Sequence, residues 1–239
     1  MAGGDGTRQD AERRKEESPS IAAGQHPGIE PSLNGPLVVT NVTRFANSKG
    51  ETLQTSSTME LCRCGGSKTK PFCDGTHSRR GFASERGSKN KRDHVVDYPG
   101  AQITVHFNEQ QCSGAGECAR GLPSVFLHGD VVRLVLGKPW IQPDRGDAER
   151  IVEVIGRCPS GALRYTFGGE PGPDHTEPPG IKIRRNGPYE VQGGIPLRTS
   201  FWPAGAARQV YALCRCGASG NKPFCDGAHR RIGFKDEKN

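Results

Sequence analysis

The chain has 239 residues and a formal net charge of +7, and its 33 glycines and 18 prolines leave only 33% of residues hydrophobic. So few apolar side chains exclude one large core, and we expect several small domains that need metal centres as staples. No run of about 20 apolar residues occurs and no apolar signal core stands near the start, so we expect neither a membrane span nor a secretory signal.

The first 34 residues are rich in glycine, serine, proline and charged side chains. Such a segment buries too little apolar surface to fold, and we predict that residues 1–34 are disordered. From residue 35 onward short apolar stretches return, which predicts strands at 37–42, 52–55 and 59–61.

The loop after these strands carries three cysteines and one histidine, which are ligands for soft or borderline metals. The same loop returns 152 residues later, so that the pattern C-x-C-x8-C-x3-H occurs at Cys62, Cys64, Cys73 and His77 and again at Cys214, Cys216, Cys225 and His229. In each loop the C-x-C pair can chelate one metal ion, and the third cysteine with the histidine can take a second. The offset holds from Gly35 to Phe82, which indicates a duplicated module of about 48 residues. A tetrahedral zinc site with three cysteines and one histidine stays open as an alternative.

Both loops resemble the CDGSH iron–sulfur domain of the mitoNEET-type family, whose motif runs C-x-C-x2-S/T-x3-P-x-C-D-G-S/A/T-H. They match it at every fixed position, with Thr76 and Ala228 in the variable slot. The resemblance implies a 2Fe-2S cluster in each copy, with one iron on the C-x-C pair and the other on the third cysteine and the histidine. In that family two modules pair as a small β-rich dimer, so two modules in one chain imply an intramolecular pseudo-two-fold pair.

A different domain is expected between the modules, at 93–168. Apolar alternation predicts strands at 103–107, 131–136 and 163–167, and helical spacing predicts helices at 117–122 and 147–156. This order of strands and helices in about 75 residues indicates an α+β sandwich of the ferredoxin type.

The cysteines of this domain sharpen the prediction. Bacterial ferredoxins hold clusters with C-x2-C-x2-C and a remote C-P. Here Cys112 and Cys118 keep the first and third positions, Ala115 stands in the middle one, and Cys158 supplies the remote member before a proline. Three thiolates suit a cuboidal 3Fe-4S cluster, which we expect here, and the stretch resembles single-cluster ferredoxins with a divergent motif. A 4Fe-4S cluster with a fourth ligand from water, Glu117 or another side chain is the alternative.

The remaining residues complete an α+β chain. A proline-rich linker is expected at 169–180, and the second CDGSH module at 181–239, with strands at 181–183, 189–191 and 210–213. The predicted architecture is therefore a first module at 35–92 and a second at 181–239, paired by a pseudo-two-fold axis, with a ferredoxin-like domain inserted between them.

Nine cysteines could form a disulfide framework, but their number is odd and they stand in C-x-C and C-P settings that are typical of metal ligands. We therefore expect a reducing, cytoplasmic location. The positive charge offsets that of cluster thiolates, and the basic run after the first loop is typical of a solvated connector, so we expect no nucleic-acid partner.

Metal centres whose positions are all filled by protein leave no open site for substrate, and no nucleophile–base pattern accompanies them. We therefore expect no enzyme but an electron-transfer protein, a monomer with an internal pseudo-dimer that serves a redox partner protein. The alternative is a donor of labile 2Fe-2S clusters to an apo iron–sulfur acceptor, or a redox and pH sensor, because a histidine ligand can take a proton near neutral pH. A zinc-binding RNA-interaction protein is the third hypothesis.

Overall fold

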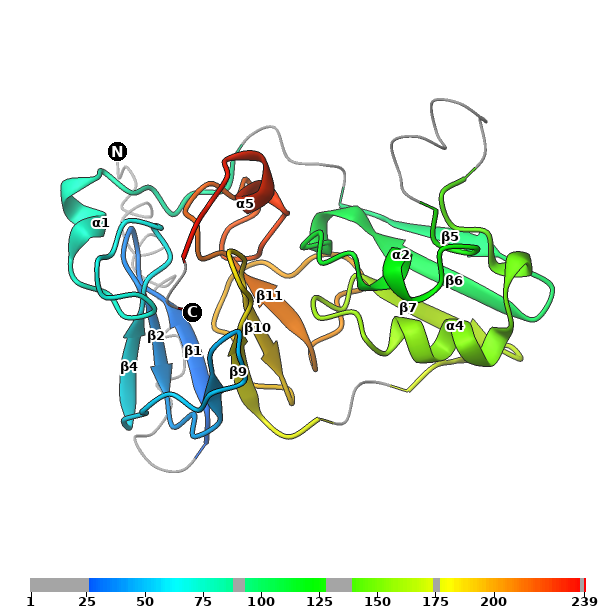
Figure 1. Ribbon diagram of the computed structural model, residues 1–239, viewed down its shortest axis with the longest axis horizontal. Helices are drawn as coiled ribbons and strands as arrows, with labels where there is room; N and C mark the ends of the chain where they lie inside the picture. The colour runs from blue at the N-terminus through cyan, green and yellow to red at the C-terminus, as the bar shows by residue number, and fades with distance from the viewer. Residues whose placement is uncertain (1–25, 88–92, 128–138, 174–176, 237–238) are drawn as a thin grey trace, which may run out of the picture.

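The computed structural model describes residues 26–87, 93–127, 139–173, 177–236 and 239. In these residues the strands form three sheets, with the orders β1-β2-β4, β11-β10-β9-β3 and β5-β6-β7-β8. The first two sheets belong to the duplicated modules and lie side by side, and the third belongs to the middle domain (Figure 1). The mixture of sheets with a few helices agrees with the predicted α+β class.

The sheet of the first module is antiparallel and consists of β1 (Gly28–Pro31), β2 (Leu37–Thr40) and β4 (Thr58–Leu61). Strand β1 lies inside the segment that we predicted to be disordered, so for these residues the prediction was wrong. Ile29 is buried there, and its strand is held by pairing with β2 and with Leu197 of the second module. The bridge to Leu197 of the other module leaves no local signal. The rest of the prediction, at 1–25, lies outside the described residues.

The sheet of the second module contains β9 (Gly180–Ile183), β10 (Tyr189–Gln192) and β11 (Tyr211–Leu213), and β3 (Phe45–Ala46) of the first module completes it. Strand β3 runs parallel to β9 and pairs Phe45 with Ile181. A parallel bridge likewise joins Ile29 to Leu197. These two pairs are equivalent at the offset of 152 residues, so each module lends the other one short extended segment.

One apolar core lies between the two modules. The alternating burial of β2 and β10 turns every second side chain inward, as expected for strands with one solvated face. Buried residues of both modules form a continuous cluster, namely Ile29, Leu37, Val39, Val42, Phe45, Met59, Leu61, Ile181, Ile183, Tyr189, Val191, Ile195, Leu197, Tyr211, Leu213 and Phe224. The two modules therefore share this apolar core.

In its described residues, the middle domain packs helix α4 (Ala148–Ile155) against a four-stranded antiparallel sheet. Its strands are β5 (Val95–Pro99), β6 (Ile103–Asn108), β7 (Leu163–Phe167) and β8 (Glu170–Pro171). Its helices are α2 (Glu117–Gly121), α4 and the short 3-10 helices η1 (Glu109–Gln111) and η2 (Pro143–Arg145). Helix α4 buries Ala148, Ile151, Val154 and Ile155, which share one face at helical spacing.

Three details of the predicted elements need correction or fall outside the structure. Residues 52–55 form no strand, because Thr52 makes only a single bridge to Ala46. Strand β8 lies in the stretch that we predicted to be a linker, where it pairs with β7. The predicted strand at 131–136 lies outside the described residues.

Candidate metal centres

Each CDGSH-like loop arranges its four ligands as two pairs. In the first loop the sulfur atoms of Cys62 and Cys64 are 3.7 Å apart, and Cys73 Sγ lies 3.3 Å from His77 Nδ1. The second loop repeats this geometry, with 3.8 Å between the sulfurs of its C-x-C pair and 3.4 Å between its cysteine sulfur and histidine Nδ1. Across the described residues, no three His, Cys, Asp or Glu side chains converge closely enough to hold a single metal ion. Two pairs fit a binuclear centre, in which each iron takes two protein ligands.

A tight turn brings the third cysteine and the histidine together. Gly75 has φ 76° and precedes helix α1 (Thr76–Arg79), and Gly227 has φ 81° and precedes helix α5 (Ala228–Arg231). Glycine adopts this left-handed conformation without the strain that a Cβ would cause. Asp74 fixes the turn, because its carboxylate accepts hydrogen bonds from the backbone N–H of Thr76 (3.0 Å) and of Lys68 (2.8 Å). These N–H donors hold the pKa of Asp74 well below its usual range.

Burial disfavours free thiolates at the cysteines of both loops, so these side chains are suited to binding a metal. It raises the pKa values of Cys64, Cys73 and Cys225, because a bare thiolate is poorly solvated there. In the other C-x-C pair, a hydrogen bond from the Cys216 thiol lowers the pKa of Cys214 and raises that of Cys216. A metal ion replaces these shared protons by direct bonds to sulfur. The donor set therefore fits an iron–sulfur cluster.

The two loops meet along their C-x-C segments. Cys64 and Cys216 form an antiparallel bridge, which makes one ligand of each centre the direct neighbour of one ligand of the other. The approach depends on two glycines, since a Cβ on Gly65 would lie 2.5 Å from the carbonyl oxygen of Cys216 and a Cβ on Gly217 would lie 2.5 Å from that of Cys64. No side chain fits in this space.

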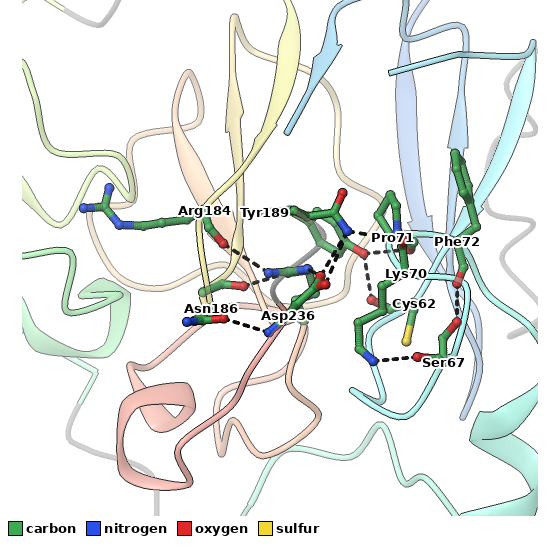
Figure 2. A network of polar contacts seen from close by, with 12 residues as sticks. Cys62, Ser67, Lys70, Pro71, Phe72, Arg184, Asn186, Tyr189 and Asp236 are labelled. Carbon is green, nitrogen blue, oxygen red and sulfur yellow. Dashed lines mark hydrogen bonds and ion pairs between the residues drawn. The ribbon is translucent and has the colours of Figure 1, made fainter. Parts of the chain in front are cut away.

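Two residues that the sequence did not single out join the modules beneath the loops. The Tyr189 hydroxyl lies 2.9 Å from the carbonyl oxygen of Cys62 and 3.0 Å from that of Pro71, and Figure 2 shows both contacts. Tyr189 is fully buried, and burial raises its pKa. Asn239 donates from its side chain to the Lys70 carbonyl oxygen at 3.2 Å.

Each C-x-C segment encloses a buried arginine. Arg63 donates to the carbonyl oxygens of Gly35 and Ser32, and burial lowers its pKa to about 10. Arg215 makes the equivalent bonds and also forms an ion pair with Asp236. Both partners of this pair are almost completely buried. The recurrence of arginine inside both C-x-C motifs was the signal in the sequence for these residues, whereas nothing local pointed to Tyr189 or Asp236.

The third cysteine and the histidine of each loop, which we call the outward ligands, differ in exposure between the two loops. Cys225 and His229 are buried, with 2% and 8% of their surface exposed, whereas Cys73 and His77 are partly exposed. Burial lowers the pKa of His229, and the neighbouring charge of Arg230 lowers it further. The duplicated loops are therefore alike in geometry but not in access.

In the middle domain, the three predicted cysteines line one pocket. Cys112, Cys118 and Cys158 surround it together with Ala115, and the buried hydroxyl of Ser113 at its wall has no hydrogen-bond partner among the described residues. Burial and the two neighbouring cysteines raise the pKa of Cys118 to about 11. Three sulfurs and one unsatisfied donor around a pocket fit an iron–sulfur cluster, whose sulfides accept hydrogen bonds.

Glu117, which the sequence offered as a fourth ligand, is held by two arginines at the rim of this pocket. Its carboxylate oxygen lies 2.8 Å from Arg120 and 2.6 Å from Arg184. Burial alone would raise the pKa of Glu117, but the hydrogen bonds and charges of Arg184 and Arg120 lower it overall. The carboxylate is thus already engaged in ion pairs.

Comparison with known proteins agrees with both kinds of site. Residues 34–78 and 186–230 match the family described as "Iron-binding zinc finger CDGSH type", and residues 98–167 match that described as "Divergent 4Fe-4S mono-cluster". The chain is similar to the uncharacterized protein YjdI of Escherichia coli strains K12 and O157:H7, with 44% identity over 68 residues, which are 28% of this chain and 80% of each relative. No solved structure matches the chain.

Two further observations concern the surroundings of these sites. All nine cysteines lie in the described part of the chain, and none of them forms a disulfide. Within the same residues, no helix has both the length and the apolar character needed to cross a membrane.

Proposed function

Because the chain carries two domains that match the CDGSH iron-binding family on either side of a domain that matches the divergent 4Fe-4S mono-cluster family, we propose that this iron–sulfur protein transfers electrons. The proposed cofactors are two 2Fe-2S clusters, one in each CDGSH loop, and one 3Fe-4S cluster on Cys112, Cys118 and Cys158. The division of each CDGSH ligand set into two pairs carries the proposal.

The proposed three-iron cluster rests on the protein groups around the middle pocket. Ala115 stands where a ferredoxin would supply a further cysteine, and Glu117 is occupied by two arginines. Three thiolates then remain as ligands. A 4Fe-4S cluster is the alternative that the family description favours, and it would need a ligand from outside this set.

We also propose that the two modules form an intramolecular pseudo-two-fold pair with the middle domain inserted between them. The reciprocal bridges from Phe45 to Ile181 and from Ile29 to Leu197 support this arrangement, as do the mutual contacts of Gly65 and Gly217. Because each module completes the other, the proposed functional unit is a monomer.

The chain's own residues hold and orient the centres and supply no substrate chemistry. Bound clusters would provide one-electron redox chemistry. The buried guanidinium of Arg63 interacts favourably with a thiolate at Cys214, which supports the negatively charged ligand set, whereas the charge of Arg215 is paired with Asp236. Because protein side chains fill every ligand position, we propose that the protein is not an enzyme but an electron carrier for a redox partner protein. The proposed location is reducing and cytoplasmic. No nucleic-acid partner is part of the proposal.

A second candidate function is donation of a 2Fe-2S cluster to an apo iron–sulfur acceptor, or sensing of redox state or pH. The partial exposure of Cys73 and His77 favours it, because an acceptor must reach the ligands that it replaces. Transfer of a cluster to apo-ferredoxin under oxidising conditions would support the donor, whereas fast reversible reduction without transfer would support the carrier.

The first experiment is a visible absorption spectrum of the purified protein, with iron and sulfide counted per chain and low-temperature EPR before and after dithionite. We expect about seven irons per chain and a three-iron signal in the protein as isolated. About four irons without that signal would remove the cluster from the middle domain. A colourless protein that contains zinc would contradict the redox function altogether.

A further inference from the structure

The two CDGSH loops differ in their surroundings because the middle domain packs on the second loop. In Figure 1 the second module lies between the first module and the middle domain. The backbone at Ser113 and Gly114, next to the predicted ligand Cys112, approaches the turn at Gly227, where a Cβ would lie 3.6 Å from the Ser113 carbonyl oxygen. This turn joins the outward ligands Cys225 and His229.

Two arginines of the second module hold this contact. Arg230, one residue after His229, donates to the Gly114 carbonyl oxygen at 2.9 Å. Arg184 donates to the Ala115 carbonyl oxygen at 3.2 Å and forms an ion pair with Glu117 at 2.6 Å. Both arginines therefore bind the same loop of the middle domain. Their hydrogen bonds are charge-assisted, and such bonds are stronger than those between neutral groups.

The first module lacks these arginines at the equivalent positions. At the offset of 152 residues, Arg184 corresponds to Ser32 and Arg230 corresponds to Ser78. Ser78 is exposed, and the ligands Cys73 and His77 beside it are partly exposed, whereas their counterparts in the second module are buried. The two arginines thus occur only in the copy that the middle domain covers.

We infer that the middle domain is a built-in cap on the second CDGSH centre, fastened by Arg184 and Arg230, so that small reagents and cluster acceptors reach the first centre more readily than the second. The inference rests on the proposed iron–sulfur function and adds to it a division of labour between the two copies. The first copy is open to exchange, and the second is enclosed by the chain itself.

The test compares the accessibility of the two centres in the intact, cluster-loaded chain. The protein is incubated with an iron chelator and iodoacetamide, and mass spectrometry follows alkylation of the peptides that contain Cys73 and Cys225. We expect Cys73 to be alkylated at least about tenfold faster, because the second centre must first break the contacts of its cap. Equal rates, or faster alkylation of Cys225, would overturn the inference.

A second experiment tests whether Arg184 and Arg230 cause the difference in accessibility, by replacing them with the serines that stand at the equivalent positions of the first module. The double variant Arg184→Ser and Arg230→Ser should bring the alkylation rate of Cys225 close to that of Cys73. Arg231→Ser is the matched control, since Arg231 is exposed, neighbours Arg230 and corresponds to an arginine in the first module; it should leave the rate unchanged. If Cys225 of the folded double variant is alkylated at the parent's rate, the proposed role of the two arginines is wrong. If the double variant does not fold, the two single variants replace it.

Failure of the inference and failure of the proposed function remain distinguishable. Iron and sulfide are counted before the chelator is added. A chain purified without them contradicts the iron–sulfur function and the inference together. A fully loaded chain that loses both CDGSH centres at one rate contradicts only the division of labour.

Discussion

The Tyr189 hydroxyl of the second module donates a hydrogen bond to the carbonyl oxygen of Cys62, a ligand residue of the first module. Tyr189→Phe should destabilise the fold by about 1–2 kcal/mol, because it leaves a buried carbonyl group without this donor. It should also change the redox potential of the proposed 2Fe-2S centre in the first module more than that of the proposed centre in the second. Urea unfolding and an EPR-monitored redox titration measure the two effects.

Tyr211→Phe is the matched control for this variant. The Tyr211 hydroxyl is equally buried, but it donates at 2.6 Å to the Ile195 carbonyl oxygen within its own module. We expect a similar loss of stability and no selective change at the first centre. Equal shifts of that centre's potential in both variants would contradict a specific role for Tyr189.

The close approach of the C-x-C segments predicts a large effect of a single methyl group. In Gly65→Ala or Gly217→Ala the new Cβ would overlap the opposite backbone carbonyl, so the modules must separate locally. We expect a loss of more than about 3 kcal/mol in stability and lower iron content per chain. Thermal unfolding and iron analysis check this.

Gly50→Ala separates the backbone strain from the clash. Gly50 has φ +86°, close to the +84° of Gly217, but a Cβ there meets no atom within 4 Å. It should lose only about 1 kcal/mol, the cost of placing alanine in the left-handed region. If Gly50→Ala and Gly217→Ala are equally destabilising, the contact between modules does not limit substitution.

The ion pair of Arg215 and Asp236 is buried, and we expect its loss to destabilise the protein more than the loss of an exposed ion pair. Asp236→Asn removes the only carboxylate paired with Arg215 among the described residues and leaves the guanidinium charge buried, which should cost about 3 kcal/mol. Glu153→Gln is the control, because its ion pairs with Arg150 and Arg157 are exposed and screened by solvent, and we expect no measurable change. Chemical denaturation of both variants decides the point, and equal effects would contradict it.

The close pairs of candidate ligands could be predicted from the sequence, but the contacts that join the two modules could not. The spacing of Cys62, Cys64, Cys73 and His77 fixes local chelating pairs, so the pattern itself reports the chemistry. The bridge from Ile29 to Leu197 and the hydrogen bond from Tyr189 to Cys62 join residues more than 120 positions apart, and no local periodicity records such contacts. The residue equivalent to Tyr189 in the first module is Leu37, so comparison of the repeats gave no signal there either.

The predicted histidine ligands lead us to expect that acid releases the proposed 2Fe-2S clusters. A proton competes with iron for the ring nitrogen, so cluster loss should accelerate as the pH falls from neutral to mildly acidic values. Replacing both His77 and His229 by cysteine should suppress the acid-dependent loss and the pH dependence of the potential. Absorbance decay between neutral and mildly acidic pH measures the first effect, and the prediction is wrong if the double variant loses cluster as fast as the parent.

Ala115→Cys should convert the middle centre to a four-iron cluster. Ala115 lines the same pocket as Cys112, Cys118 and Cys158, and a cysteine there restores the C-x2-C-x2-C spacing of bacterial ferredoxins. Iron should rise from about seven to about eight per chain, and the three-iron EPR signal of the isolated protein should disappear. The matched control is Ala115→Ser, which is similar in size but lacks a thiolate and should keep the three-iron signal. If the parent protein already contains about eight irons, the variant Glu117→Gln tests whether the Glu117 carboxylate is the fourth ligand of the cluster. In that case we expect the iron content to stay unchanged, because Arg184 and Arg120 already engage the carboxylate. An unchanged iron content would mean that solvent supplies the fourth ligand.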